Sequence, residues 1–595
     1  MTTVYSMFKD TVREHSSHVA ARFKADGQWQ TQSWAELGAE VEKVSAALLA
    51  IGLEPLSRVS IISNTRLEWV TADLGILGAG CTTVPIYQSS TADDMQYIIN
   101  DAEVVAAFVE NAAQVQKLKE IKSQIPNVKQ IISFDAVEDN EDGWVLTWSE
   151  LVARGTAELD GVRESLEARM SDASPDDLLT LVYTSGTTGR PKGVMITHDN
   201  MVYEAGAIEQ IGIITPADVQ LLFLPLAHIF AKVLEVTWIK LAHEMAFAES
   251  IEKVVPNMAE VKPTFMASVP RIFEKVYAKV VSGATSQSGI KGKLARWAFS
   301  KEAEATTLER AGKKAGGLGW KLAQKLVISK VKVKLSDLFG GRLKFFISGG
   351  APLPPDIAYF FKHSGVMILE GYGLTETSAA TCVNLPDKLK LGTVGPVLPG
   401  TEVRIAEDEE IMIRGRGVFK GYWNRPEATA EALEEDGWFH SGDLGSFDGP
   451  FLKITGRKKD LIITAGGKNI APQNIESKIK SSNPIIGQVV LHGDRRKFLS
   501  AVVTIDEAAV LEWAAQRGLS SEYTELTQSP EVYASIDDTF KVVNQELARY
   551  ETVKKFKVLS EDFSIEGGEL TPSLKVKRNV VEKRHMDIFD SFYGS

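Results

Sequence analysis

The sequence contains only two cysteines, Cys81 and Cys382, among its 595 residues. So few cysteines exclude a disulfide framework and favour a reducing compartment, which makes the cytoplasm the expected location. No run of about eighteen apolar residues occurs, so a transmembrane helix is not expected. Residues 1–22 mix charged and apolar side chains without a long apolar core, and therefore do not have the pattern of a signal peptide.

The chain is also short of basic residues, because 66 Lys and Arg stand against 78 Asp and Glu and give a net charge of −12. This balance argues against general nucleic-acid binding. The window between Arg271 and Gly340 is basic, unlike the chain as a whole: it contains fifteen Lys and Arg and five Asp and Glu. The aromatic residues Trp297, Phe299 and Trp320 also lie in this window. Such a pattern is typical either of a solvated helical face or of a patch on an anionic membrane surface. The second interpretation predicts peripheral contact with the inner membrane surface.

Length and pattern together predict an α/β protein with more than one domain. A chain of 595 residues exceeds the size at which a single core stops growing. Strand-like apolar runs alternate with helix-like periodicity over 58–109 and again over 178–369, which predicts two lobes, each with a parallel sheet covered by helices. Residues 135–176 are acidic and weakly patterned, so they are expected to form excursions on the surface.

The pattern changes twice in the second half of the chain. From Gly392, glycines and prolines separate short alternating runs, which predicts β-hairpins. Residues 456–460 contain no apolar side chain and form the predicted linker. The expected domains are 1–455, with α/β lobes to about 391 and a β subdomain over 392–455, and a mobile α+β domain over 461–595.

The stretch Tyr183–Gly193 (YTSGTTGRPKG) follows the apolar run Leu178–Val182, which is predicted to be a buried strand. Glycine permits positive φ and lets backbone amides crowd around an anion, because it has no Cβ. Hydroxyl groups add donors and Lys192 adds a positive charge, so a phosphate site is favoured over a solvated surface turn. The stretch lacks the Gly-Lys-Ser/Thr spacing of a Walker A motif, which disfavours a P-loop kinase or GTPase.

Six motifs in a fixed order make the chain resemble the adenylate-forming acyl-CoA synthetase superfamily. They are Tyr183–Gly193, Leu224–His228, Ser348–Pro352, Gly371–Thr377, Ser441–Asp443 and Gly456–Asp460. The basic insertion after Arg271 and the ending Leu570–Lys575 are most similar to the AMP-forming long-chain fatty acid–CoA ligases. The resemblance implies ATP-dependent conversion of a long-chain fatty acid to an acyl-adenylate with release of pyrophosphate, followed by acyl transfer to CoA with release of AMP.

The resemblance also implies a nucleotide site in which the phosphates, the adenine and the ribose of ATP are each held by a different motif. The implied phosphate-binding residues are Thr184, Ser185, Gly186, Thr187, Thr188, Gly189 and Lys192, with Thr375 at the α-phosphate. The residues implied for the adenine pocket are Gly350, Ala351, Pro352, Gly371, Tyr372 and Gly373, and those implied for the ribose are Asp443 and Arg457.

The resemblance also implies which residues bind Mg²⁺, stabilise the transition state of adenylation and form the hinge between the domains. Glu376 and Thr184 would hold Mg²⁺. Lys575 would stabilise the transition state of adenylation, with Lys577 as the alternative, because Leu574 stands where the superfamily usually has glycine. The remaining implied roles are His228 for orientation of the fatty carboxylate or gating of its tunnel, Lys459 as the hinge, and Gly467 along the path of CoA.

The sequence leaves three alternatives open. The adenylate can be transferred to a carrier-protein pantetheine instead of CoA, although no carrier attachment motif follows the adenylate-forming motifs. Aryl or luciferin-type acids are disfavoured by the long basic insertion. From another functional class, the chain can be a catalytically silent nucleotide-binding regulator, which the intact set of implied catalytic and binding residues disfavours.

Overall fold

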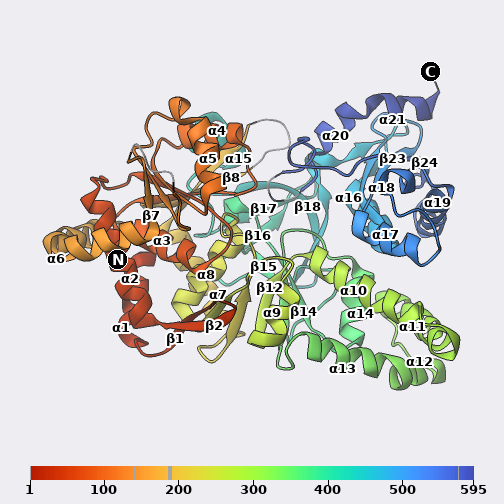
Figure 1. Cartoon of the computed structure of the whole chain (residues 1–595). Coiled ribbons are helices and arrows are strands. Elements are labelled where there is room, and N and C mark those ends of the chain that lie inside the picture. Colours follow the sequence, from red (N-terminus) through yellow and green to blue (C-terminus); the bar gives the residue numbers. More distant parts are fainter. Residues whose placement is uncertain (1, 139–142, 185–189, 572, 574, 595) are drawn as a thin grey trace.

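The computed structural model describes residues 2–138, 143–184, 190–571, 573 and 575–594. A large N-terminal part carries two α/β sheets and a small antiparallel sheet, and a smaller α+β part follows it (Figure 1). This architecture confirms the predicted α/β class, with two lobes, a β subdomain and a small C-terminal domain. Among the described residues, none of the helices combines the length and the apolar character that spanning a bilayer requires.

The first lobe is a seven-stranded sheet in the order β7-β6-β5-β3-β4-β8-β9, in which every neighbouring pair is parallel except β8–β9. All five residues of β4 are buried, as expected for a strand covered on both faces. The strands are β3 (Arg58–Ile62), β4 (Thr82–Ile86), β5 (Val104–Val109), β6 (Gln130–Ser133), β7 (Val145–Thr147), β8 (Leu178–Thr184) and β9 (Lys192–Thr197). The helices of this region are α2 (Trp34–Ala50), α3 (Leu67–Gly78), α4 (Ala92–Asp101), α5 (Ala112–Glu120), η1 (Lys122–Gln124) and α6 (Trp148–Asp172).

The prediction of surface excursions over 135–176 is wrong, because this region contains the 25-residue helix α6. A capping box starts the helix: the Thr147 hydroxyl accepts the Glu150 N–H, and the Glu150 carboxylate accepts the Thr147 N–H. Gly155 lets α6 lie close to α2, since a Cβ there would stand 1.9 Å from the Lys43 carbonyl oxygen. The helix buries few residues, so its apolar periodicity is weak, although the Thr-x-x-Glu signature is present in the sequence.

The second lobe is an eight-stranded sheet in the order β15-β14-β13-β12-β10-β11-β1-β2. Its central strands are parallel, and β15 and β2 at the two edges are antiparallel to their neighbours. The strands are β1 (Val19–Ala25), β2 (Gln28–Ser33), β10 (Val219–Leu222), β11 (Glu244–Phe247), β12 (Phe265–Ser268), β13 (Phe345–Ser348), β14 (Ile368–Tyr372) and β15 (Cys382–Val383). The helices are α1 (Val4–Glu14), α7 (His198–Ile211), α8 (Ile229–Leu241), α9 (Val254–Val261), α14 (Pro355–His363) and η3 (Thr375–Thr377).

The carboxyl ends of β13 and β14 lead directly into two of the motifs, Gly349–Pro352 and Gly373–Thr377. Because both strands are parallel, these motifs emerge at the same edge of the sheet, where ligands of open α/β sheets bind. The two lobes share one continuous apolar core, which fixes their relative position.

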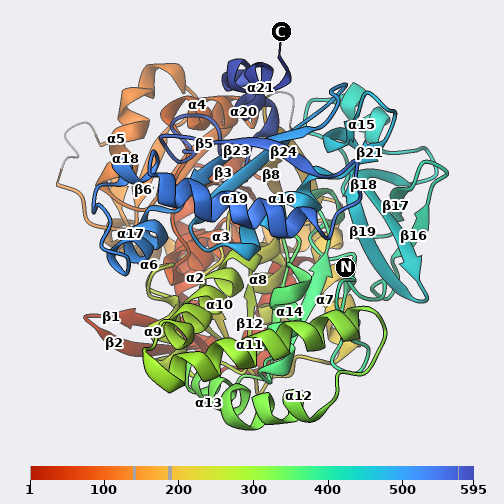
Figure 2. The ribbon, with the colours of Figure 1, turned by 90° about the vertical axis from the view of Figure 1, so that its right-hand side faces the viewer.

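The basic window forms a group of helices between β12 and β13, as predicted. These are α10 (Pro270–Thr285), α11 (Gly289–Arg310), α12 (Leu318–Ala323), the π-helical turn η2 (Gln324–Ile328) and α13 (Ser329–Leu338). A connection that contains Gly312, Gly316 and Gly317 lies between α11 and α12. Figure 2 shows α11, α12 and α13, in green, in the lowest part of the view and away from the C-terminal end of the chain.

The β subdomain is a four-stranded antiparallel sheet, and the predicted hairpins are confirmed. Its elements are β16 (Glu402–Ile405), β17 (Glu410–Arg414), α15 (Pro426–Ala432), β18 (Phe439–Asp448) and β19 (Phe451–Arg457). The register places Asp443 of β18 opposite Arg457 of β19.

The short helix η4 (Lys458–Asp460) leads into the C-terminal part, which has its own apolar cores. Its strands are β20 (Ile462–Ile463), β21 (Asn469–Ile470), β22 (Ile486–His492), β23 (Leu499–Ile505) and β24 (Val553–Val558). Its helices are α16 (Pro472–Ser482), α17 (Glu507–Ala515), α18 (Tyr523–Leu526), α19 (Pro530–Asn544), α20 (Arg578–Arg584) and α21 (Met586–Tyr593). An ion pair of 2.7 Å between Arg271 of α10 and Asp506, the N-cap of α17, joins this part to the second lobe.

Candidate active site

One large cavity lies where the two lobes, the β subdomain and the C-terminal part meet. Its volume is about 3310 Å³, and every part of the molecule contributes to its lining. Of the predicted site residues that the structure describes, only Gly467 is absent from this lining; it lies in the turn between β20 and β21. The predicted residues in the lining are Thr184, Lys192, His228, Gly350, Ala351, Pro352, Gly371, Tyr372, Gly373, Thr375, Glu376, Asp443, Arg457, Lys459 and Lys575.

The predicted phosphate-binding stretch connects the two strands of a hairpin. Thr184 at the end of β8 is paired with Lys192 at the start of β9, so the two ends of the connection meet at the cavity. These ends supply one hydroxyl group and one ammonium group. The predicted residues Ser185, Gly186, Thr187, Thr188 and Gly189 lie outside the described residues.

Tyr422 links Lys192 to Glu376. The Lys192 Nζ lies 4.7 Å from the centroid of the Tyr422 ring, and the Tyr422 hydroxyl donates a hydrogen bond of 2.9 Å to Glu376 Oε1. Burial, and then the Glu376 carboxylate, raise the pKa of Tyr422 above its usual range, so the hydroxyl keeps its proton. The cation–π contact and the hydrogen bond hold a cation and a carboxylate at the same wall of the cavity.

Asp443 is held between Tyr372 and Arg457. The Tyr372 hydroxyl donates a hydrogen bond of 2.8 Å to Asp443 Oδ2, and Arg457 Nε lies 3.4 Å from Asp443 Oδ1. Burial raises the pKa of Asp443, while Arg457 acts in the opposite direction. Each carboxylate oxygen keeps a further lone pair, so Asp443 can still accept hydrogen bonds from the hydroxyl groups of a ligand.

Two glycines shape the wall that leads to these residues. Gly373 has no space for a side chain, because a Cβ would stand 1.7 Å from the Ala379 carbonyl oxygen. Gly350 has a φ of +79°, in the left-handed region that glycine adopts without strain. The backbone therefore turns sharply after β13, and it runs close to Ala379 after β14, which leaves both motifs facing the cavity.

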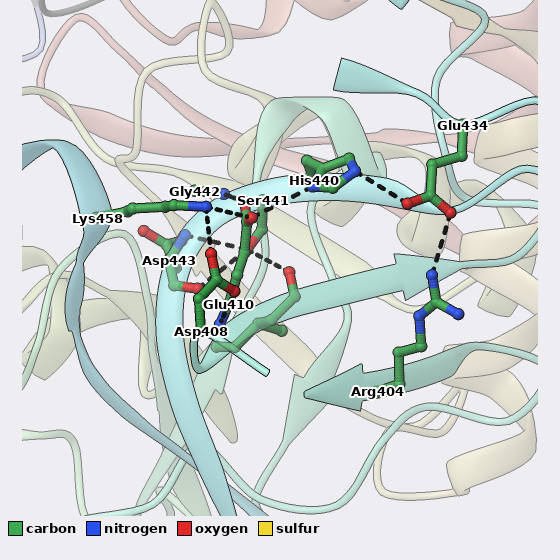
Figure 3. A network of polar contacts seen from close by, with 10 residues as sticks. Arg404, Asp408, Glu410, Glu434, His440, Ser441, Gly442, Asp443 and Lys458 are labelled. Atoms are coloured by element: carbon green, nitrogen blue, oxygen red, sulfur yellow. Dashed lines mark hydrogen bonds and ion pairs between the residues drawn. The ribbon is translucent and has the colours of Figure 1, made fainter. Parts of the chain in front are cut away.

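Glu410 holds the turn that carries Asp443 (Figure 3). Its carboxylate accepts the Gly442 N–H at 2.9 Å and lies 3.2 Å from Nδ1 of His440. These contacts fix the backbone on the N-terminal side of Asp443. The sequence does not mark Glu410 as a site residue, because its only signal is a carboxylate at the start of a short strand.

Lys458 ties the predicted linker to the β subdomain. Its ammonium group forms an ion pair of 3.0 Å with Glu410 and a second ion pair with Asp408, as Figure 3 shows. Lys459, the next residue, is exposed. The anchored residue and the predicted hinge are therefore adjacent in the chain.

The C-terminal part brings Lys575 into the cavity. The Lys575 N–H donates to Thr571 Oγ1 at 3.0 Å and the Thr571 N–H donates to the Lys575 carbonyl at 2.8 Å, so the backbone of Lys575 is bonded to Thr571. The surrounding protein lowers the pKa of Lys575 and Arg457 lowers it further, whereas Asp443 and Glu376 act in the opposite direction. Water can still reach the side chain within the cavity. Lys575 thus lies among the residues predicted for ribose and Mg²⁺.

Lys577 and His228 have different surroundings. Lys577 precedes α20, and its N–H donates to the Glu569 carbonyl at 2.7 Å. His228 precedes α8, and its Nδ1 accepts the Phe230 N–H at 3.2 Å. Burial, and then the charge of Lys575, lower the pKa of His228 to about 3. The ring is therefore neutral, and its proton is on Nε2, which becomes a hydrogen-bond donor.

The cavity includes an apolar section between α7, α8 and β13. Lys232 of α8 does not line this section; it is buried in ion pairs with Asp73 of α3 and Glu235 of α8. Lys232 therefore joins the two lobes. The apolar lining residues include Ile208, Ile211, Ile213, Phe223, Leu234 and Ile347.

Glu370 is a further carboxylate in the lining that the sequence analysis missed. It directly precedes Gly371 on β14, and burial raises its pKa to about 7, partly offset by the Gly392 N–H at 3.4 Å. Its carboxyl group therefore changes its protonation near neutral pH. The sequence signal was only its position beside the glycine-tyrosine motif.

Comparison with known proteins gives matches over the whole chain. A family model for AMP-binding enzymes matches residues 8–423, and a model for the AMP-binding enzyme C-terminal domain matches residues 459–595. A long-chain-fatty-acid–CoA ligase of Mycobacterium bovis is 34% identical over 596 residues, which cover 99% of this chain and 97% of that protein. One from Homo sapiens is 33% identical, with coverage of 99% and 85%. The adenylation domain of a carboxylate reductase from Mycobacterium chelonae has a similar fold, with a TM-score of 0.75 and 22% identity over 100% of this chain and 91% of that one.

Proposed function

The chain belongs to the AMP-binding family of adenylate-forming enzymes, and from this membership we propose that it is a long-chain fatty acid–CoA ligase. A fatty carboxylate oxygen attacks the α-phosphorus of ATP, which forms the acyl-adenylate and releases pyrophosphate. The CoA thiol then loses its proton and attacks the acyl carbon, which gives the thioester and releases AMP. The observation that carries the proposal is the position of Lys575, from the C-terminal part, in the lining of the same cavity as Asp443 and Arg457 of the β subdomain.

In the first half-step the protein positions the reactants and neutralises charge, because transfer at phosphorus needs little covalent chemistry from side chains. Lys192 neutralises the departing phosphates, and Lys575 neutralises charge that develops at the α-phosphate. Asp443 accepts the ribose hydroxyls and Arg457 donates to the same sugar. The neutral ring of His228 donates from Nε2 to the fatty carboxylate and orients it.

The residues present fit Mg²⁺ as a partner of ATP. Among the described residues, no group of three or more His, Cys, Asp or Glu could form a protein-only metal site. Mg²⁺ in nucleotide sites usually takes one or two carboxylates and completes its shell with phosphate oxygens and water. Glu376, fixed by Tyr422, supplies such a carboxylate, and Thr184 supplies a hydroxyl in the same cavity. When bound, Mg²⁺ neutralises phosphate charge as pyrophosphate leaves.

For the second half-step we propose that the C-terminal part rotates about Lys459. Lys458 stays bound to Glu410, and Lys459, the next residue of the short helix η4, changes its φ and ψ in this rotation. Because it is exposed, it can adopt a new conformation without exposing apolar surface.

This rotation withdraws Lys575 from the cavity and breaks the ion pair between Arg271 and Asp506. Asp506 keeps its second role after the rotation, since its Oδ1 accepts the Ala509 N–H at 3.0 Å within the same part. Gly467 then approaches the cavity and gives clearance to the pantetheine of CoA. The ion pair between Arg271 and Asp506 is partly exposed to solvent, so breaking it costs little free energy.

The choice of a long acyl chain is supported by the apolar section of the cavity and by the names of the two fatty-acid relatives. Each buried methylene contributes about 0.8 kcal/mol, so a long chain gains affinity from this section alone. The section starts beside Ile347, directly before Ser348 and the Gly349–Pro352 motif, and continues to Ile213 after α7.

A pyrophosphate-release assay with ATP, Mg²⁺ and a series of fatty acids, with and without CoA, tests the proposal. Release that is greatest with long chains and continues only with CoA supports it. Turnover that needs a carrier protein, or release confined to aryl acids, assigns a different acceptor or acid. No release with any acid makes the chain a nucleotide-binding regulator.

Replacing Ile208 with tryptophan is expected to shift the preference toward shorter acids. The indole would fill part of the apolar section, so a long chain loses contact for about two methylenes, which is about tenfold in kcat/KM. Acids that end before Ile208 should keep the wild-type value. Gln210→Trp is the matched control, because Gln210 is exposed on the same helix. Equal effects of both variants on every acid would contradict the assignment of the section.

The alkaline limb of kcat/KM for ATP should lie below the ordinary lysine range of about 10.4. The pKa of Lys575 is lowered in the folded protein, so its cation is present below that pKa and is lost as the pH rises through it. Arg457→Met removes a neighbouring positive charge and should move the limb to higher pH. Asp443→Asn removes a neighbouring negative charge and should move it to lower pH. A limb that stays in place in both variants would rule out Lys575 as the titrating group.

A further inference from the structure

The helices between β12 and β13 expose an apolar ridge. Leu318, Leu322 and Leu326 are 82%, 49% and 39% exposed, and their spacing of four residues puts them on one face of α12 and η2. Val333 of α13 is 60% exposed. We call these four residues the apolar ridge. Large apolar side chains exposed together, rather than singly, mark a contact surface.

The same segment has a second apolar side, which is buried. Trp320, Ala323 and Ile328 pack with residues of α11, and Val331 and Leu335 pack into the main core. The ridge is therefore not a core face left without cover. The helices bury one apolar stripe against the protein and present another to the outside, along the lower edge of the molecule in Figure 2.

Lysines border the ridge. All five lysines of α12, η2 and α13 are exposed, and none of them forms an ion pair with a carboxylate of the described residues. The same stretch contains a single acid, Asp337. Two more exposed lysines, Lys313 and Lys314, lie in the loop before α12. The five lysines are Lys321, Lys325, Lys330, Lys332 and Lys334.

We propose that the apolar ridge and its lysines dock on an anionic lipid bilayer. The leucines enter the boundary between headgroups and acyl chains, and the lysines bind acidic headgroups, as in helices that lie in the plane of the interface. Charge complementarity selects an anionic surface over a neutral one. A second copy of the chain fits less well, because two such faces would bring like charges together.

The position of the ridge suits a substrate that dissolves in the bilayer, and this step rests on the proposed function. The lining of the cavity reaches Arg310 at the end of α11 and Asp356 at the start of α14, which form an ion pair of 2.9 Å. Arg310 lies eight residues before Leu318 along the chain. Helix α11 therefore contributes both to the lining of the cavity, through Arg310, and to the support beneath the ridge, through Ala298 and Ala305.

Co-sedimentation with vesicles, without ATP or fatty acid, tests the docking directly. Vesicles of equal parts phosphatidylglycerol and phosphatidylcholine should bind the protein, and vesicles of phosphatidylcholine alone should bind it at least tenfold less. The double variant Lys321→Glu, Lys325→Glu should lower binding to the anionic vesicles at least tenfold. The matched control is Lys554→Glu, Lys557→Glu, which changes two exposed lysines of β24 and should bind as the wild type does.

The double variant Leu322→Ser, Leu326→Ser tests the apolar half of the proposal. It should lower binding several-fold and leave the residual binding more sensitive to salt, because only the electrostatic contribution remains. Unchanged binding in both ridge variants overturns the proposal. So does equal binding to both kinds of vesicle, or a loss of self-association in sedimentation velocity instead of vesicle binding, which would assign the ridge to a second copy.

Two measurements separate this proposal from the proposed function. All variants should keep the thermal unfolding midpoint and the rate of pyrophosphate release with a short, water-soluble acid, since none of the changed residues lines the cavity. If the wild type releases no pyrophosphate with any acid, the proposed function fails while vesicle binding still decides the docking.

Discussion

Replacing Lys575 with methionine is expected to slow adenylation by about 10²- to 10³-fold, the usual cost of removing one preorganised group that stabilises charge in a transition state. The methionine side chain is unbranched and only one atom shorter than that of lysine, but it lacks the cation that interacts with Asp443. Single-turnover release of pyrophosphate measures this step. Acyl transfer from a supplied acyl-adenylate to CoA should change only a few-fold, because the proposed rotation withdraws Lys575 from the cavity before that half-step.

Lys577→Met is the matched control for this variant. Lys577 also lines the cavity, but it lies at the start of α20, where its backbone is bonded to Glu569. We expect a change of less than about threefold, as for a charge beside a site and partly screened by solvent. If Lys577→Met greatly slows the release of pyrophosphate and Lys575→Met slows it only slightly, Lys577 and not Lys575 stabilises the transition state of adenylation.

The elements that the sequence predicts well are those with a strong apolar pattern. The apolar pattern predicts a helix over Ile229–Leu241, a helix over Pro355–His363 and a strand over Val104–Val109, and all three have the same bounds in the structure. Helix α6 was missed for the converse reason: it buries little more than Leu151 and Gly155, so tertiary contact with α2, and not periodicity, stabilises it.

The sequence names most of the residues that line the cavity, but it does not show the contacts between them. Tyr422 and Glu376 are 46 positions apart, and Lys458 and Glu410 are 48 apart, so their contacts depend on how sheets and loops pack. The packing of the basic window, residues 271–340, is likewise not visible in the sequence. Its charge is visible in the sequence, whereas the exposure of Leu318 follows from which side of α12 packs on α11.

Variants of Glu376 and Tyr422 separate the charge of the carboxylate from the hydrogen bond that orients it. Glu376→Gln removes the negative charge but keeps an oxygen that can accept the Tyr422 hydroxyl, so the fold should be retained. Tyr422→Phe removes the hydrogen bond and keeps the charge. A residue that orients a metal ligand typically contributes 10–100-fold to metal affinity or activity, and we expect about tenfold for Tyr422→Phe.

Glu376→Gln should lower kcat/KM for ATP in the presence of Mg²⁺ by about 100-fold or more, since it removes the carboxylate itself. Binding of Mg²⁺-free ATP, measured by calorimetry, should be unchanged or tighter, because the variant removes a negative charge that faces the phosphates. Glu376→Gln should therefore weaken the use of Mg²⁺-bound ATP while it leaves the binding of Mg²⁺-free ATP unchanged or makes it tighter. Tyr422→Phe should weaken the Mg²⁺-bound form modestly and leave the other unchanged. Equal weakening of both forms by Glu376→Gln would mean that Glu376 supports the nucleotide site without holding the ion.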